Sequence, residues 1–279
     1  MLVLMTWRVM AEDKVCIQCA TPNLRDKWSS TGLPKQPAGL KYDKDCADVG
    51  ASKMVLKEWL SGNCASSCFE LMVPVDGYYQ YVRGCHEDFV WDEMKVQLTN
   101  GTQNCQVNQV PDYGNVGILT KETEFASAYA GTSFCPPVDS TTATKCMVLY
   151  DGKVTVNGVE ECSSGAVHTC KSCEENDGTG SCTASTSGTC KGVYCSKTSG
   201  KLNGHFYESR GCASFNPFAR DVCSWSDQTF NVSSGVETTV GLSFRVDQCF
   251  CEGELCNSTP PYLSAWIISI ISLSFLVFA

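Results

Sequence analysis

Apolar and polar residues alternate along several short stretches of the chain, as half-buried β-strands do. The longest such stretch is TVGLSFRVDQCFC, residues 239–251. Two further stretches place a turn between strand-like halves: CFELMVPVDGYYQYVRGC, with Asp76-Gly77 at its centre, and GVYCSKTSGKLNGHFYESRGC, with a Gly/Ser/Lys/Asn loop. Asp-Gly and Asn-Gly favour tight hairpins, and they recur at 151–152 and 157–158 within CMVLYDGKVTVNGV. The pattern predicts a protein built of short antiparallel hairpins.

Helical periodicity is confined to SKMVLKEWL, residues 52–60, where Met54, Val55, Trp59 and Leu56 could share one face. The stretch CKSCEENDGTGSCTASTSGTC, residues 170–190, shows neither period and is expected to be a loop held by its cysteines. Its acidic residues Glu174, Glu175 and Asp177 could bind calcium but lack the spacing of an EF-hand loop.

The two hairpin stretches follow the same order of features. Each runs from a cysteine through a strand, a glycine-bearing turn and an aromatic strand to Arg-Gly-Cys, and in both the end cysteines are 17 positions apart. This repeat indicates two diverged copies of one unit. It predicts Cys68–Cys85 and Cys195–Cys212 as equivalent cross-strand disulfides.

The chain of 279 residues contains 20 cysteines, which in a secreted protein predicts a disulfide framework. The alternative is zinc or redox sites at Cys16-x2-Cys19 and Cys170-x2-Cys173, but the number of other cysteines and the ends of the chain favour disulfides. The cysteines form a first group of eight, up to Cys135, and a second of twelve, from Cys146, separated by polar PPVDSTTATK. Each even-numbered group could close on itself.

This grouping predicts two modules with short flanking segments. The expected divisions are a weak or truncated signal peptide at 1–11, a first module at 12–135, a linker at 136–145, a second module at 146–257 and a hydrophobic tail at 258–279. No basic residue precedes the apolar run at the start, and Arg8 interrupts it, so the true start could lie upstream.

The tail LSAWIISIISLSFLVFA, residues 263–279, has no charge and no basic residue after it. A short terminal apolar run after small residues is typical of a GPI-attachment signal. The expected attachment residues are Asn257 and Ser258, because an earlier site would cut into the cysteine framework. The alternatives are a single membrane-spanning helix and a buried terminal helix.

Three sequons fit a secretory route: Asn100-Gly-Thr, Asn231-Val-Ser and Asn257-Ser-Thr. Asn100 and Asn231 are the expected glycosylation sites, since the third sequon precedes a proline and competes with the anchor.

Net charge is −9 without a basic run, which argues against nucleic acid as a partner. The three histidines, at 86, 168 and 205, have no metal-ligand spacing, and phosphate-loop and nucleophile-elbow motifs are absent from the sequence. We therefore expect no enzymatic activity, no metal and no cofactor.

Aromatic residues precede both Arg-Gly-Cys motifs: Tyr78, Tyr79 and Tyr81 in the first, Phe206 and Tyr207 in the second. They could form a binding face, since Tyr is favoured at interfaces, or they could be cross-strand packing.

The box Cys249-Phe-Cys251-x4-Cys256-Asn257 resembles the end of three-finger domains, the superfamily of the urokinase receptor, the lymphocyte antigens and the snake toxins. With CKGVYC and Arg-Gly-Cys, residues 146–256 are most similar to the ET module of roundworm proteins. The first half resembles the Odr/Hot group through the cysteines from Cys16 to Cys68, Trp28 and Arg83-Gly84-Cys85, but it lacks a terminal Cys-Asn box.

The resemblance implies Cys223–Cys249 and Cys251–Cys256 disulfides, and an Asn257 side chain tied to the backbone at the base of the fingers. The expected fold is all-β, small and disulfide-rich: two three-finger-like modules with short antiparallel sheets and a C-terminal hydrophobic helix or signal. The expected function is a GPI-anchored recognition protein on the outer face of the plasma membrane. It would bind an extracellular or membrane protein and modulate a receptor or channel in neuronal signalling. The alternatives are a structural or protective surface protein and a secreted enzyme.

Overall fold

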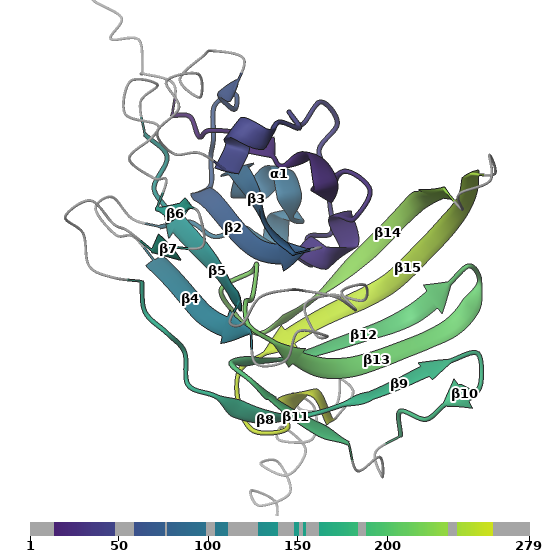
Figure 1. Cartoon of the computed structure of the whole chain (residues 1–279). Helices are drawn as coiled ribbons and strands as arrows, with labels where there is room; N and C mark the ends of the chain where they lie inside the picture. The colour runs from purple at the N-terminus through teal and green to yellow at the C-terminus, as the bar shows by residue number, and fades with distance from the viewer. Residues whose placement is uncertain are drawn as a thin grey trace, which may run out of the picture.

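The computed structural model describes residues 14–47, 59–75, 77–98, 104–110, 128–138, 148–150, 153–154, 162–183, 188–233 and 239–258. Its architecture is mostly antiparallel β-sheet stapled by disulfides, which confirms the predicted fold class. Figure 1 shows two sheets that meet where β5 and β15 end, with the hairpins of the second sheet extending away from this junction.

The first sheet has the strand order β1-β3-β2-β5-β4. Its strands are β1 (Cys19–Ala20), β2 (Cys68–Val75), β3 (Tyr78–Cys85), β4 (Asn104–Val110) and β5 (Ala128–Cys135). Short helical turns cover it: η1 (Pro22–Leu24), η2 (Trp28–Thr31), η3 (Lys44–Ala47), α1 (His86–Phe89) and η6 (Asp92–Met94).

The second sheet has the order β10-β9-β13-β12-β15-β14. Its strands are β9 (Cys173–Asn176), β10 (Thr179–Gly180), β12 (Tyr194–Leu202), β13 (His205–Ala213), β14 (Val222–Ser233) and β15 (Thr239–Cys251). Two smaller pairs are β6 (Leu149–Tyr150) with β7 (Lys153–Val154), and β8 (His168–Lys171) with β11 (Thr189–Gly192); η8 (Cys256–Ser258) ends the described chain. Apart from β10, the two sheets have the same order of strands.

The registers extend this equivalence to single residues. Cys68 lies opposite Cys85 on one side and Cys135 on the other. In the second sheet, Cys195 lies opposite Cys212 and Cys251. The 17-residue spacing of the sequence therefore marks a repeated register, and the two halves have the same sheet architecture.

The predicted cross-strand disulfides are nevertheless wrong. Cys68 bonds Cys16 and Cys85 bonds Cys64; likewise, Cys195 bonds Cys170 and Cys212 bonds Cys190. Three cysteines lie opposite one another in one row at the base of each sheet. A disulfide within this row would leave the segments that cross the base without a covalent link to the sheet. The observed disulfides instead link the sheet to the segments that pass over its base.

The halves share three disulfides in the same order. In each, the first cysteine of Cys-x2-Cys bonds the start of the hairpin, the second bonds the next cysteine along the chain (Cys19–Cys46 and Cys173–Cys182), and the fourth bonds Arg-Gly-Cys. The second half also contains Cys223–Cys249 and Cys251–Cys256, the two pairs that the resemblance implies.

The predicted division into eight and twelve cysteines is wrong, because Cys105 bonds Cys162 across it. The register explains this bond: Cys105 lies opposite Ser133, as Cys223 lies opposite Cys249. A serine stands where the second half has a cysteine, so Cys105 takes its partner from a later segment. That segment follows the edge of β4, where Gln106 and Ser163 form a bridge.

Residues beyond the predicted linker also pack on the first sheet. The Glu70 carboxylate accepts hydrogen bonds from the backbone N–H groups of Val148 and Leu149, at 2.8 and 3.2 Å. Arg83 pairs with Glu70 and donates to the Leu149 carbonyl at 2.6 Å. The first module thus extends to about residue 163, rather than ending at Cys135.

The other predicted elements agree with the structure in part. The hairpins of β2 with β3, β6 with β7 and β12 with β13, and the strand at 239–251, are confirmed. The expected loop at 170–190 contains strands, because β9 pairs with β13 and β8 with β11 although their polar residues give no alternation. The predicted helix at 52–60 falls mostly outside the described residues, as do the 157–158 turn, the leader at 1–11 and the tail from Thr259.

One core spans both modules. Trp28, Leu33 and Phe89 of the first pack in the same buried cluster as Phe218 and Phe250 of the second. Several hydrogen bonds reinforce this contact, including Asn108 Nδ2 to the Ser214 carbonyl at 2.7 Å. The relative placement of the modules is therefore fixed by apolar packing and by hydrogen bonds.

Candidate functional site

Asn257 closes the base of the second module. Its side-chain oxygen accepts from the Lys171 N–H at 2.9 Å, and its amide nitrogen donates to the carbonyls of Lys171, Ser196 and Gly211 at 3.0, 2.9 and 3.3 Å. The residue is 4 % exposed and ties β8, β12 and β13 together. A primary amide can satisfy this mixture of donors and acceptors, which a carboxylate cannot.

The Arg-Gly-Cys arginines hold the equivalent segments of both modules. Arg210 donates to the carbonyls of Asn257 and Ser258 at 3.1 and 2.7 Å, while Glu208 pairs with its guanidinium at 2.7 Å. In the first module, Arg83 donates to the Leu149 carbonyl and pairs with the Glu70 carboxylate. Burial lowers the pKa of Arg83 to about 9, so it remains a cation at neutral pH.

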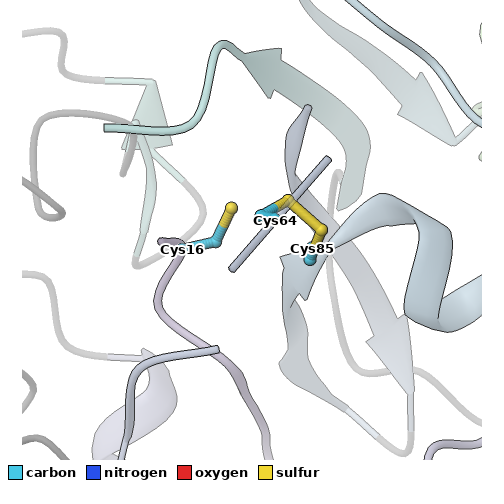
Figure 2. A group of neighbouring side chains, drawn as sticks. All are labelled: Cys16, Cys64 and Cys85. Carbon is cyan, nitrogen blue, oxygen red and sulfur yellow. A yellow bond between two sulfur atoms is a disulfide. The ribbon is translucent and has the colours of Figure 1, made fainter. Parts of the chain in front are cut away.

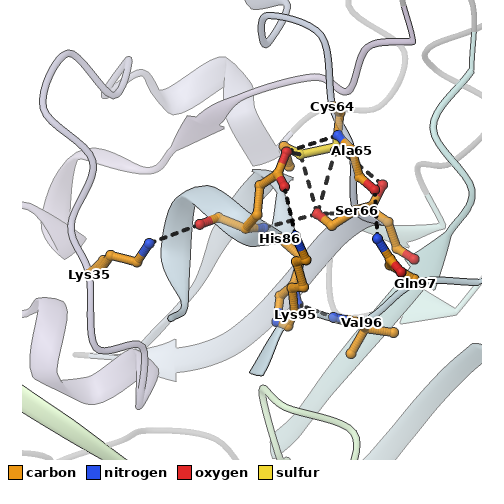
Figure 3. Close-up of polar contacts among 11 residues, drawn as sticks. Lys35, Cys64, Ala65, Ser66, His86, Lys95, Val96 and Gln97 are labelled. Carbon is orange, nitrogen blue, oxygen red and sulfur yellow. Dashed lines mark hydrogen bonds and ion pairs between the residues drawn. A yellow bond between two sulfur atoms is a disulfide. The ribbon is translucent and has the colours of Figure 1, made fainter. Parts of the chain in front are cut away.

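His86 lies at the junction of the modules. Its Nδ1 accepts from the Val96 N–H at 3.0 Å, so the ring proton is on Nε2, which donates to the Pro217 carbonyl at 2.9 Å. Burial lowers the pKa of His86 to about 4. Figure 3 shows the surrounding contacts, in which Lys35, Ala65 and Ser66 hold the segment of α1. His86 is therefore a neutral structural residue that links the modules.

Cys16, Cys64 and Cys85 bring three sulfur atoms within 4.8 Å of one another. Figure 2 shows the Cys64–Cys85 bond in this cluster, and Cys16 is bonded to Cys68. A metal ligand has to be a thiolate, and these sulfurs are held in disulfides. The cluster is a pair of neighbouring staples below the sheet.

The aromatic residues of the expected binding face divide into two sets. Tyr81 and Tyr207 are buried, at 1 % and 3 % exposure, and Tyr79 packs beside the Tyr81 cluster. Tyr78 and Phe206 are exposed, at 69 % and 45 %, immediately after the turns of their hairpins. The five residues do not form one face; two of them mark the hairpin tips, and the others support the hairpins from within.

Sequence reasoning missed a cavity of about 210 Å³ between the modules. Its floor is the face of the second sheet formed by β12, β13 and β15, and Ser29 and Gly32 around the end of η2 contribute from the first module. The residues of the floor include Ser196, Thr198, Tyr207, Ser209, Gln248 and Phe250. They are scattered over 55 positions of sequence, and the register alone brings them together.

A polar row crosses the sheet in this cavity. Ser209 lies opposite Thr198, and Thr198 lies opposite Gln248 on its other side. The row continues to Glu174 on β9 and Ser224 on β14. Residues directly opposite one another share a face of a sheet, so these side chains point the same way.

Comparison with known proteins gave no match: no family model, no curated protein and no solved structure matches this chain. The structure itself is that of an all-β, disulfide-rich chain and is compatible with a three-finger-like fold. Within the described part of the chain, no helix is long and apolar enough to cross a membrane.

Proposed function

We propose that the protein is a GPI-anchored recognition protein of the three-finger superfamily, exposed on the outer face of the plasma membrane. The observation that carries the proposal is the repeated base: both modules use the same three disulfides, the same register of cysteines and an arginine that holds the closing segment. Such a base keeps the hairpins rigid while their tips are free to vary and recognise a partner.

The tips supply the proposed contacts with a protein partner. Tyr78 and Phe206 are large aromatic side chains whose exposure leaves them unused by the core, and buried aromatic anchors dominate many interfaces. A receptor or channel in neuronal signalling is the partner class that the family resemblance suggests.

The structure around η8 favours Ser258 over Asn257 as the attachment residue. Attachment at Asn257 would remove the Ser258 carbonyl, which accepts the shorter of the two Arg210 hydrogen bonds to this segment. Attachment at Ser258 would leave both acceptors in place. The Asn257 side chain itself has no room for a glycan, because its amide donates to three carbonyls inside the module. Asn231 lies in β14 and remains a predicted glycosylation site; Asn100 lies outside the described residues.

The anchor is tested by expressing the full chain on cultured cells behind a complete secretion signal and adding phosphatidylinositol-specific phospholipase C. Release of the intact protein into the medium supports the proposal. Retention, with deacylation used to exclude an enzyme-resistant anchor, would contradict it and favour a spanning tail.

Recognition is tested by cross-linking on intact cells, comparing the wild type with Tyr78→Ser and Phe206→Ser. We expect a specific cross-linked partner whose yield falls in these variants. Thr189→Ser is the matched control, since Thr189 is exposed on β11, which pairs with β8 at the base of the second module. Cross-linking that is unchanged in both tip variants would contradict recognition through the tips.

A further inference from the structure

The inter-module cavity contains a buried polar group without a protein partner. Gln248 is 7 % exposed and lines the cavity, and its side-chain amide makes no hydrogen bond among the described residues. A primary amide offers two donors and two acceptor positions, and those of Gln248 face the open space of the cavity. The site therefore offers hydrogen-bonding positions to a molecule that enters the cavity.

The neighbours of Gln248 extend this hydrogen-bonding surface. The hydroxyl of Thr198 stands beside it in the polar row, and Ser209 follows. The ligand thus meets a line of neutral hydroxyl and amide groups.

Aromatic rings lie on both sides of the line. Phe250 is two positions from Gln248 along β15, and Tyr207 is two positions from Ser209 along β13. Side chains two positions apart on a strand share a face. Gly211 adds no side chain there: a Cβ at this position would meet only the Ser196 hydroxyl, at 3.8 Å. The floor of the cavity thus has a central line of polar groups with an aromatic ring on each side.

The charges and polar groups of the lining argue against anionic and purely apolar ligands. Arg210 contributes to the lining, but its guanidinium is occupied by Glu208 and by the carbonyls of Asn257 and Ser258. A phosphate or carboxylate would therefore find no free cation among the described lining residues. Glu174 is exposed at the edge of the polar row. A purely apolar ligand would leave the Gln248 amide unpaired.

A neutral sugar ring fits these features, because it presents hydroxyl groups at its edge and C–H groups on its faces. The cavity volume of about 210 Å³ is below the roughly 300–1,000 Å³ of sites for drug-sized ligands, which suits one ring rather than an oligosaccharide. We propose that this cavity binds one neutral pyranose residue of a glycan, through the Gln248 amide and the Thr198 hydroxyl. This site is separate from the hairpin tips and from the anchor.

The test uses the full-length protein after enzymatic removal of its N-glycans. The probes are the methyl glycosides of glucose, galactose, mannose and N-acetylglucosamine, with glycerol as a control for unspecific hydroxyl contacts. Saturation-transfer NMR measures binding. We expect at least one glycoside to bind and glycerol to give no signal.

Two variants assign the binding to the cavity. Gln248→Leu removes the amide at similar size, and Thr198→Val replaces the hydroxyl by a methyl group; each should weaken binding about tenfold or more. Thr229→Val makes the same change on an exposed part of β14 and should bind as the wild type does. Circular dichroism establishes that each variant is folded, and Thr198→Val alone suffices if Gln248→Leu does not fold.

Three results would overturn the proposal: no glycoside binds, glycerol binds equally well, or Thr198→Val binds as tightly as the wild type. Phospholipase release and tip-dependent cross-linking do not depend on this cavity. A negative glycoside-binding result would therefore not affect the proposed surface function. Negative phospholipase or cross-linking results would likewise not affect the proposed sugar site.

Discussion

Replacing Asn257 should destabilise the second module more than its place at the end of the fold suggests. The side chain makes four hydrogen-bond contacts, three of them at 2.9–3.0 Å and one at 3.3 Å. Because the amide has two N–H hydrogens, two of the three carbonyls share one of them. Each typical bond contributes a net of about 1 kcal/mol. The expected loss of unfolding free energy in Asn257→Ala is therefore about 3–4 kcal/mol, a large part of the roughly 5–15 kcal/mol of a normal domain.

Asn257→Asp sharpens this test because it keeps the shape of the side chain. An ionised carboxylate cannot donate to the carbonyls of Lys171, Ser196 and Gly211, so the loss at neutral pH should be at least as large as in the alanine variant. Protonation restores one donor, so the deficit of Asn257→Asp relative to the wild type should shrink as the pH falls. The deficit of Asn257→Ala should show no such change.

The assay is guanidinium unfolding of the oxidised, purified protein, followed by tryptophan fluorescence. Both variants also remove the third sequon, so Thr259→Ala, which removes the sequon and keeps Asn257, is the matched control and should be as stable as the wild type. A loss below about 1 kcal/mol in Asn257→Ala would refute the reasoning, because it would mean that the four hydrogen bonds contribute nothing net.

Three further predictions concern the first module and the junction. The folded-state pKa of His86, about 4, is below the unfolded value of about 6.5, so the stability that the neutral ring contributes is complete above pH 6.5 and falls by about 3 kcal/mol as the pH drops to 4. Denaturation measured across this pH range should show a smaller loss of unfolding free energy in His86→Gln than in the wild type. An equal loss in both proteins would contradict the buried neutral ring. Ser133→Cys combined with Cys162→Ser should join Cys105 to residue 133, as β14 is joined to β15; peptide mapping that left Cys105 free would contradict the equivalence. Arg83→Met leaves Glu70 buried without its cation and should cost about 3–5 kcal/mol, visible as poor secretion and a lower denaturation midpoint; a loss under about 1 kcal/mol would show that the pair is not essential.

The strands were predictable because their signals are local. Alternation marks β15, and a turn dipeptide divides β2 from β3. The strands β8 and β9 carry no such pattern, because each has only four residues, most of them polar, and tertiary pairing rather than local sequence decides their conformation. The repeat of 17 residues indicated the duplication correctly, since it reports a register.

Disulfide partners were less predictable than strands. A spacing shows which cysteines lie opposite each other, but the partner depends on which segment crosses the base, and that is a long-range property. One sequence match does indicate the partner of Cys105: Ser133-Phe-Cys135 matches Cys249-Phe-Cys251 except at its first position. Aligning the two would have shown that Cys105 lacks its local partner and that the first module has to continue beyond residue 135.

The binding residues were the least predictable part. The exposed Tyr78 and Phe206 could not be distinguished from the buried Tyr81 and Tyr207 by residue type, since all four lie in similar strands. The cavity needs packing between the modules, and Gln248 stands in a strand without any motif. Its role becomes visible only when the fold places its amide in the cavity.

The central claim, a duplicated module closed by the same three disulfides, is tested most directly by peptide mapping of the secreted protein without reduction. The account predicts linked peptides joining Cys16 to Cys68 and Cys64 to Cys85, matched in the second module by Cys170–Cys195 and Cys190–Cys212. It also predicts the Cys105–Cys162 link, which extends the first module beyond Cys135. Free thiols at these positions, or Cys68 linked to Cys85, would contradict it.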